Sequence, residues 1–253
     1  PDANGKFNRE DALSGEISTR YTMNVVGRQN GTGKYFVITD RFSDKTSVYL
    51  YDAEANSFSD TAVLAHPEFD ISSLIFSRRA EDFGDLIGFS YDGPVSTAYW
   101  LDPEMKGIQD GLNAAFPGKH VALVDYTADR NRVLFQVSAP NSPPAYYVLV
   151  NKSKVAVIGS QRPWIDEDSL GKGDFVYYTA RDGMKIPAII TYPAGYREGD
   201  KAKGAIIVPH GGPWARDYAG FDSSGWTQFF ASRGYIIMQP QYRGSAGWGR
   251  ELW

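Results

Sequence analysis

The chain has 253 residues, a mass of 28.0 kDa and no cysteine, and its formal net charge is −4 with a pI near 5.4. These values exclude disulfides, cysteine zinc sites and thiolate enzymes, and the scattered lysines and arginines exclude a nucleic-acid-binding protein. With 42% apolar residues the sequence can bury a core, and no apolar run approaches the roughly 20 residues that a membrane span needs. We expect a globular chain, and both a cytoplasmic and a periplasmic location stay open.

Residues 1 to about 160 consist of short segments rich in Tyr, Val, Ile and Phe that alternate with clusters of Gly, Pro, Asn and Asp. This composition predicts an all-β domain of short strands. Three stretches resemble one another, because in each a strand leads through a polar turn into an aromatic-rich strand that a second polar turn follows. They read YFVITDRFSDKTSVYLYDAEANSF, LIGFSYDGPVSTAYWLDPEMKGI and VLFQVSAPNSPPAYYVLVNKSKV.

The three stretches recur at a nearly constant spacing, because Tyr49, Tyr99 and Tyr147 occupy equivalent positions 50 and 48 residues apart. A period near 50 residues is typical of four-stranded propeller blades, so we predict about three blades of a β-propeller. The alternative is an ordinary antiparallel protein in which tyrosines before turns recur without a true repeat. Three blades cannot close a ring of four to eight, and the prediction for residues 1–165 is therefore a partial propeller.

The pattern changes after SQRPWIDEDSLG, and we predict a domain boundary near residues 161–172. Residues 175–196 then predict a β-hairpin whose turn is Asp182-Gly183, because two strand-forming runs flank this dipeptide. A polar spacer, REGDKAK, separates the hairpin from the next element. The hairpin begins the second predicted domain, residues 166–253.

A strand, a helix and a second strand follow the spacer. The short apolar runs GAIIVP and YIIMQPQ predict strands that are buried on both faces. The stretch between them, SSGWTQFFASRG, predicts a helix that is capped by Ser223 or Ser224 and that ends at Gly234. This order predicts the first part of a parallel α/β sheet.

His210, Gly211, Gly212 and Pro213 follow the first of these strands. Glycines directly after a buried strand let the backbone turn sharply, so that main-chain N–H groups can point into a cleft and hold an oxyanion. Pro213 fixes its own φ and restricts Gly212, and His210 can brace the loop by hydrogen bonding. For the motif alone, the alternative is an ordinary turn after a strand.

The motif is part of a longer region of resemblance. The sequence resembles the serine peptidases of the prolyl oligopeptidase family, particularly the acylaminoacyl peptidase and bacterial dipeptidyl peptidase branch. The segments that carry the resemblance are DGMKIPAIITYPAGY, IIVPHGGPWARD and WTQFFASRGYIIMQPQYRGSAGWGRELW, together with the repeat before them. The resemblance implies a seven-bladed propeller that caps an α/β-hydrolase domain and a Ser-Asp-His triad that cleaves short peptides. We expect no cofactor and no metal, because the sequence has no cysteine, no histidine pair at i, i+4 and no HExxH motif.

The resemblance also implies roles for individual residues. Gly212 gives the oxyanion N–H, while His210, Gly211 and Pro213 shape the loop. On the substrate side of the same cleft it places three further residues: Trp214, Tyr242 and Arg243. The sequence departs from the family pattern in that Gln241 stands where Asn is commoner and Trp248 where Tyr or Phe is commoner.

The triad itself is not in the sequence, because no GxSxG pentapeptide occurs. The nearest candidate is Ser245 in RGSAGWG, but Arg243 stands where the nucleophile turn needs glycine, so Ser245 is not the predicted nucleophile. We expect the nucleophile, Asp and His beyond Trp253. His210 precedes that position, so it is not the predicted catalytic base. The other histidines are interpreted as structural: His66 in a loop and His120 at the start of a strand.

We therefore expect a fragment of a serine exopeptidase or oligopeptidase that acts on short peptides and has the remaining segments of the same enzyme as partners. Because the triad is missing, these residues alone should be inactive. The alternatives are an esterase-type acyl hydrolase and a non-catalytic propeller that binds peptides or proteins. An acidic group is interpreted as a solvated loop; its members are Glu81, Asp82 and Asp85.

Overall fold

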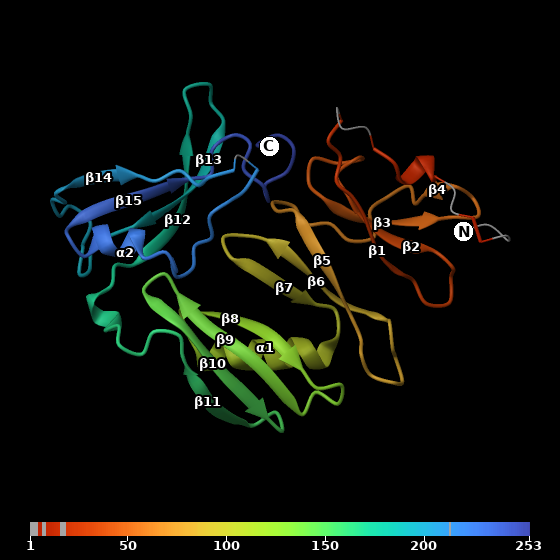
Figure 1. The fold of residues 1–253 in the computed structure, drawn as a ribbon, viewed down its shortest axis with the longest axis horizontal. Coiled ribbons are helices and arrows are strands. Elements are labelled where there is room, and N and C mark those ends of the chain that lie inside the picture. The colour runs from red at the N-terminus through yellow and green to blue at the C-terminus, as the bar shows by residue number, and fades with distance from the viewer. Residues whose placement is uncertain (1–4, 7–8, 16–18, 213) are drawn as a thin grey trace. The chain divides into compact units, whose positions relative to one another are not determined.

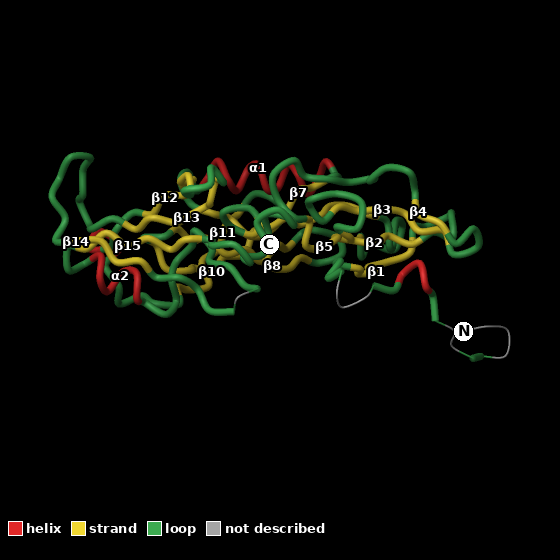
Figure 2. The backbone as a smooth tube through the Cα atoms, turned by 90° about the horizontal axis from the view of Figure 1, so that it is seen from above, coloured by secondary structure: helices red, strands yellow, loops and turns green. Residues whose placement is uncertain are grey.

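The structure is a computed structural model that describes residues 5–6, 9–15, 19–212 and 214–253 (Figure 1). The described residues divide into two compact units. The first runs to Gly93 and includes Gly247–Glu251, and the second consists of Pro94–Ala246 with Leu252–Trp253. Figure 2 shows that strands and loops predominate and that the helical segments are short.

Among its described residues, the first unit has one 3-10 turn, Asp11–Leu13, and strands follow it. Four of these strands form an antiparallel sheet in which chain neighbours pair, and β5 pairs with β6. The core of the first unit consists of buried side chains from four strands: Phe36, Ile38, Val48, Ile71 and Phe89. The strands are β1 (Met23–Arg28), β2 (Tyr35–Thr39), β3 (Ser47–Asp52), β4 (Ser57–Phe58), β5 (Ile71–Phe76) and β6 (Leu86–Asp92).

The second unit contains two further sheets. One has the antiparallel order β11-β10-β9-β8, and the other has the mixed order β12-β13-β15-β14. The elements are β7 (Ser96–Trp100), α1 (Pro103–Ala115), β8 (His120–Tyr126), β9 (Arg132–Ala139), β10 (Ser142–Val150), β11 (Lys154–Ser160), a 3-10 turn (Glu167–Ser169), β12 (Gly173–Thr179), β13 (Lys185–Thr191), β14 (Gly204–Ile207), α2 (Trp226–Ala231) and β15 (Tyr235–Pro240).

The predicted repeat corresponds to observed strands. Tyr49, Tyr99 and Tyr147 lie on β3, β7 and β10, which are the aromatic-rich second strands of the three stretches. The sheets β1-β2-β3-β4 and β11-β10-β9-β8 are four-stranded antiparallel meanders, which is the unit that a propeller blade requires.

Helix α1 lies outside the predicted all-β pattern, because it stands where the second polar turn of the middle stretch was expected. Asp102 is its N-cap and accepts a hydrogen bond from the N–H of Met105 at 2.9 Å, and Pro103 occupies the first turn. The apolar side chains it buries lie three or four residues apart: Met105, Ile108 and Leu112. The signal Asp-Pro-Glu followed by this spacing was in the sequence.

The second predicted domain has the expected elements. Strands β12 and β13 form an antiparallel hairpin around Asp182-Gly183, and β14 pairs with β15 in parallel. One expectation was wrong, because β14 is not buried on both faces: it lies at one end of the sheet order and Ile207 is 66% exposed. Among the described strands only β15 pairs with it. The hydrophobic run identified the strand, but the position in the sheet depends on distant segments.

The predicted boundary segment, residues 161–172, lies inside the second unit. Glu167 in this segment accepts hydrogen bonds from the Ser142 hydroxyl at 2.7 Å and from the Lys119 ammonium at 3.0 Å. The division into domains 1–165 and 166–253 stays a prediction.

One buried side chain joins three distant parts of the second unit. Gln228 on α2 is 6% exposed, and its Nε2 donates to the carbonyl oxygens of Pro140 and Gly171, both at 2.9 Å. Its Oε1 accepts a hydrogen bond from the N–H of Gly171 at 2.8 Å. The carboxamide therefore fixes the segment before β12 to α2 and to the turn between β9 and β10.

The N-terminus of α2 differs from the prediction of a serine cap. The N-cap is Gly225, with φ at 81°, and it makes no side-chain capping bond. Instead the Asp222 carboxylate accepts hydrogen bonds from the N–H groups of Ser224 and Thr227, both at 2.9 Å. At the C-terminus, α2 ends at Ala231, three residues before the predicted end, and Gly234 lies in the turn that follows, with φ at 89°.

Replacing Asp222 with alanine should lower the unfolding free energy of the full-length protein by about 1 kcal/mol at pH 7, because the N–H of Thr227 in the first turn of α2 and the N–H of Ser224 before the helix lose their acceptor. Burial raises the pKa of Asp222, but the hydrogen bonds from Ser224 and Thr227 outweigh it, and the pKa lies below its ordinary value of 3.8. This stabilisation is therefore present above the unfolded-state pKa and is lost as the pH falls through the folded-state pKa. Urea titrations at pH 7 and pH 3 should show the difference from wild type shrinking in acid.

Ser223→Ala is the matched control for Asp222→Ala. Ser223 was one of the two predicted caps, but its recorded hydrogen bond is through the backbone carbonyl, which accepts from Arg162 at 2.7 Å. We expect a change below about 0.5 kcal/mol. Equal effects of the two substitutions would contradict the assignment of Asp222 as the capping group.

Candidate functional site

The candidate site is the segment that follows β14, which we call the glycine loop: residues 210–212 and 214–217. Gly211 and Gly212 are exposed and lie outside helices and strands. Gly212 has φ at 139°, and a Cβ placed on it would lie 2.9 Å from the backbone nitrogen of Trp214. Both the conformation and the space therefore require glycine at position 212. Pro213, which was expected to shape the loop, lies outside the described residues.

A second segment, residues 241–246, lies against the glycine loop, and we call it the clamp segment. Its position follows from the sheet, because parallel strands end at the same edge and the chain leaves both β14 and β15 there. The backbone N–H of Ala246 donates to the carbonyl of Ala215 at 3.0 Å, which ties the end of the clamp segment to the middle of the glycine loop.

His210 is held from several directions at the start of the glycine loop. Its Nε2 lies 2.7 Å from the hydroxyl of Ser245, and its Nδ1 lies 2.8 Å from the carbonyl oxygen of Gly211. The Tyr242 ring stacks on the imidazole with centroids 4.4 Å apart, and the Tyr242 hydroxyl donates to the His210 carbonyl at 2.7 Å. The imidazole is thus a bridge between the clamp segment and Gly211.

Gln241 holds the other end of the loop. Its Oε1 accepts from the N–H of Asp217 and its Nε2 donates to the Asp217 carbonyl, both at 3.1 Å. Gln241 has no exposed surface, so these two bonds are shielded from water. The Asp217 carboxyl is half-buried; burial raises its pKa above the ordinary value, and a hydrogen bond with Gln239 opposes that rise.

The remaining predicted site residues are placed as follows. Trp214 is 59% exposed, and its ring centroid lies 6.4 Å from that of Trp253. Arg243 forms an ion pair with Asp182 at the turn of the β12–β13 hairpin. The structure thus brings His210, Gly211, Gly212 and Tyr242 together and directs Arg243 to the hairpin.

Sequence reasoning missed two residues of this site. Ser245 was set aside as a nucleophile and given no other role, and Gln241 was noted only as a departure from the family pattern. Neither residue lies in a motif whose chemistry predicts the contact. The available signal was the strand–helix–strand order, which predicts that the loops after both strands meet at one edge of the sheet.

The other two histidines have structural contacts. The Nδ1 of His66 accepts hydrogen bonds from the N–H groups of Glu68 and Phe69, both at 3.1 Å, and its ring stacks on Tyr91. His120 begins β8, as predicted. Burial lowers the pKa of both imidazoles. In the described part of the chain, no cluster of three or more acidic or histidine side chains could hold a metal ion.

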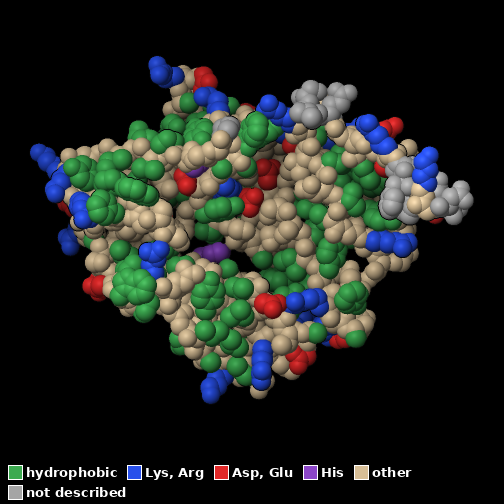
Figure 3. All heavy atoms as spheres, viewed as in Figure 1, with side chains coloured by type: hydrophobic (Ala, Val, Ile, Leu, Met, Phe, Trp, Pro, Cys, Tyr) green, Lys and Arg blue, Asp and Glu red, His purple; other side chains and the backbone are tan. Residues whose placement is uncertain are grey.

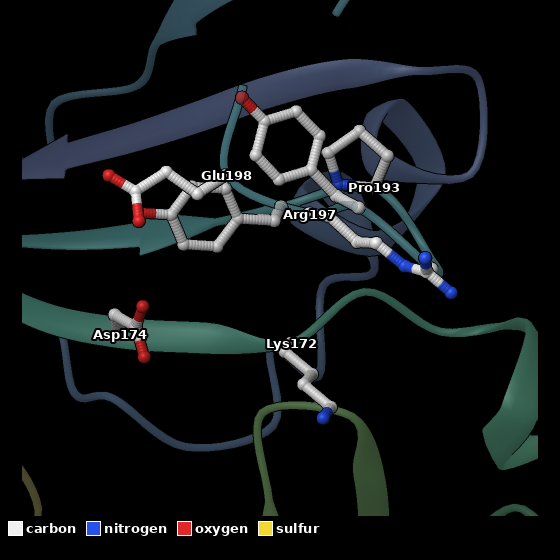
Figure 4. Close-up of a pocket in the computed structure, with 8 residues that line it drawn as sticks. Lys172, Asp174, Pro193, Arg197 and Glu198 are labelled. Atoms are coloured by element: carbon white, nitrogen blue, oxygen red, sulfur yellow. The ribbon is translucent and has the colours of Figure 1, made fainter. Parts of the chain in front are cut away.

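Two surface features of the second unit lie outside the glycine loop. Figure 3 shows apolar side chains gathered on the side that carries β14 and α2, where Ile207, Trp226 and Phe229 are exposed. A groove of about 780 Å³ lies between β12 and the segment after β13. Figure 4 shows Lys172 and Asp174 on one side of this groove and Arg197 and Glu198 on the other.

No helix among the described residues combines the length and hydrophobicity of a membrane span.

The sequence matches no protein-family model. It is 27% identical over 226 residues to dipeptidyl aminopeptidase BIII of Pseudoxanthomonas mexicana, and the match covers 87% of this chain and 32% of the relative. It is 28% identical over 241 residues to dipeptidyl peptidase family member 6 of Caenorhabditis elegans, covering 83% of this chain and 32% of the relative. The chain thus spans about a third of the length of these relatives.

Solved structures with the same arrangement are also peptidases by name. A prolyl endopeptidase matches with a TM-score of 0.63 at 16% identity, over 95% of this chain and 34% of the other. Prolyl oligopeptidase B from Galerina marginata matches with a TM-score of 0.61 at 16% identity, over 91% of this chain and 31% of the other. The strand-rich sheets match the propeller fold of such structures, as predicted. The sequence relatives are dipeptidyl peptidases and the similar folds are prolyl peptidases, which is consistent with the predicted resemblance of this chain to the prolyl oligopeptidase family.

Proposed function

We propose that the full-length protein is a serine peptidase of the dipeptidyl peptidase or oligopeptidase type that hydrolyses short peptides. The observation that carries this proposal is the exposed glycine loop directly after β14, with Gly212 in a conformation that favours glycine. The printed names of the relatives, dipeptidyl aminopeptidase and dipeptidyl peptidase, support peptides as the substrate class.

In this proposal the two predicted domains have different tasks. Residues 1–165 supply about three propeller blades, which would limit access to short peptides. Residues 166–253 form the first part of an α/β-hydrolase domain, and the parallel pairing of β14 with β15 across α2 supports this assignment. The partners of this chain are then the remaining segments of the same enzyme.

The chemical contribution of this chain is a hydrogen-bond donor. A serine outside residues 1–253 attacks the peptide carbonyl, and the N–H of Gly212 donates to the oxygen as it becomes an oxyanion. One such donor contributes about 3 to 4 kcal/mol of transition-state stabilisation. His210 is not the general base, because its Nε2 faces Ser245 and its Nδ1 faces the Gly211 carbonyl. Residues 1–253 alone are therefore inactive in this proposal.

The test is active-site labelling of the full-length protein with a fluorophosphonate, followed by peptide mapping. We expect one labelled serine, located outside residues 1–253, and hydrolysis of dipeptide anilides that the label abolishes. If no serine is labelled and the protein still binds peptides, the result would favour the alternative of a non-catalytic binding module. Labelling with hydrolysis of esters but not of anilides would favour the esterase alternative.

A further inference from the structure

We infer that Ser245 is a positioning residue that orients the N–H of Gly212 by acting through His210. This inference rests on the proposed function and deepens it. The sequence gives Ser245 no such role, because it lies 35 residues from His210, and the contact arises from the meeting of the glycine loop with the clamp segment.

The peptide group between Gly211 and Gly212 connects the imidazole with the oxyanion donor. This planar unit carries both the Gly211 carbonyl and the Gly212 N–H, and in a trans peptide the two bonds point in opposite directions. The carbonyl oxygen lies 2.8 Å from Nδ1 of His210. A hydrogen bond at this oxygen therefore fixes the direction of the N–H, which faces away from the imidazole.

The protonation of the imidazole follows from its partners. A carbonyl oxygen only accepts hydrogen bonds, so Nδ1 of His210 carries a proton and donates it to Gly211. In the neutral imidazole Nε2 is then an acceptor, and the Ser245 hydroxyl, 2.7 Å away, donates to it. The Gly211 carbonyl thus sets the tautomer, and the bond from Ser245 to Nε2 holds the ring at the angle that this carbonyl needs.

A serine and a histidine at this distance also resemble a nucleophile and its base, but three observations oppose that role. Ser245 has no exposed surface, so a substrate carbonyl cannot reach its hydroxyl. Its backbone N–H donates to the carbonyl of Tyr242 at 2.9 Å, which places it in a closed turn. The second imidazole nitrogen faces a carbonyl instead of the carboxylate that orients a catalytic base.

The experiment is steady-state kinetics of Ser245→Ala in the full-length enzyme with a dipeptide anilide. We expect kcat to fall about 10- to 100-fold, since a misdirected oxyanion donor acts on the transition state. KM should change by less than about threefold, because the substrate-binding groups are untouched. The rate of fluorophosphonate labelling should fall by a similar factor, while the final labelled fraction equals that of wild type.

Two other variants separate positioning from general stability. Ser138→Ala removes another buried hydroxyl in the same unit, on β9, and should leave kcat unchanged. Tyr242→Phe keeps the ring on the imidazole but removes the hydroxyl, which donates to the His210 carbonyl and lies 3.3 Å from Nδ1, so kcat should fall by a smaller factor than in Ser245→Ala. If Ser245→Ala does not fold, the Tyr242→Phe variant carries the test.

The outcomes distinguish the inference from the function on which it rests. An unchanged kcat in Ser245→Ala, with only a lower Tm, would overturn the inference and leave the peptidase proposal intact. The same holds for an unchanged kcat in Tyr242→Phe if that variant carries the test. Loss of all labelling in Ser245→Ala, with a label on Ser245 in wild type, would make Ser245 the nucleophile and overturn it as well. Failure of the wild-type enzyme to label any serine would remove the proposed function itself.

Discussion

Replacing Gly171 with alanine should destabilise the full-length protein by more than about 4 kcal/mol, because the site has no space for a methyl group. A Cβ on Gly171 would lie 1.7 Å from the carbonyl oxygen of Tyr192 and 3.3 Å from Cβ of Ala231. The nearest atom belongs to the backbone, so no side-chain rotation can relieve the overlap. The segment before β12 would have to move away from Tyr192 at the end of β13.

That movement would also break the hydrogen bonds of a buried side chain. The N–H and carbonyl of Gly171 both bond to Gln228, whose carboxamide has little contact with water. Buried polar groups that lose their partners cost about 1 to 3 kcal/mol each, in addition to the steric strain. We expect a lower Tm and faster amide hydrogen exchange in β12, β13 and α2 than in wild type.

Gly107→Ala is the matched control for Gly171→Ala. Gly107 lies within α1, and a Cβ there would meet no atom within 4 Å. Alanine is favoured over glycine inside a helix by about 1 kcal/mol, so this variant should be as stable as wild type or more stable. A wild-type Tm for Gly171→Ala would mean that the close approach of Tyr192 does not exist in the protein.

Replacing Arg130 with methionine should lower the unfolding free energy by about 3 kcal/mol, because Asp102 loses its cation and Glu104 keeps only Lys152. The Arg130 side chain is 1% exposed, and its Nη1 lies 2.7 Å from oxygens of both Asp102 and Glu104. Asp102 is also the N-cap of α1, so the guanidinium joins the start of this helix to the turn before β9. Methionine keeps most of the side-chain volume and removes the charge.

An exposed ion pair on the same helix provides the comparison for Arg130. Lys106 pairs with Asp110 one turn later, and both side chains are more than half exposed. Lys106→Met should therefore change the unfolding free energy by less than about 0.5 kcal/mol. Denaturant titrations of both variants check the difference. A loss below about 1 kcal/mol for Arg130→Met would show that the buried pair adds little beyond desolvation costs.

Local chemistry made part of the fold predictable from the sequence. Asp182-Gly183 marks a hairpin turn and Gly234 marks a helix end, because each depends on the conformational preferences of a few neighbouring residues. The signal for helix α1 is also local, since it consists of Asp102-Pro103 and the apolar spacing after it. The strand repeat on either side nevertheless led to the prediction of a turn at this position. The position of β14 at one end of its sheet was not local, since pairing depends on segments far along the chain.

The candidate site was also only partly predictable: the sequence indicated the glycine loop but not the clamp segment. The glycines after a strand indicated the loop and its chemistry, because few other residues permit the backbone of Gly212. The clamp was not indicated, because the His210–Ser245 and Asp217–Gln241 contacts join residues that no motif links. Such contacts exist only once β14 and β15 lie side by side.

The carboxamide of Gln228 has a consequence for how changes spread through the second unit. Its three hydrogen bonds reach Pro140, which precedes it by 88 residues, and Gly171, which precedes it by 57 residues. A substitution at any of these three positions therefore alters the hydrogen bonds at the other two. Homologous chains should vary these positions together, and a variant that alters the turn after β9 should loosen α2 without touching it.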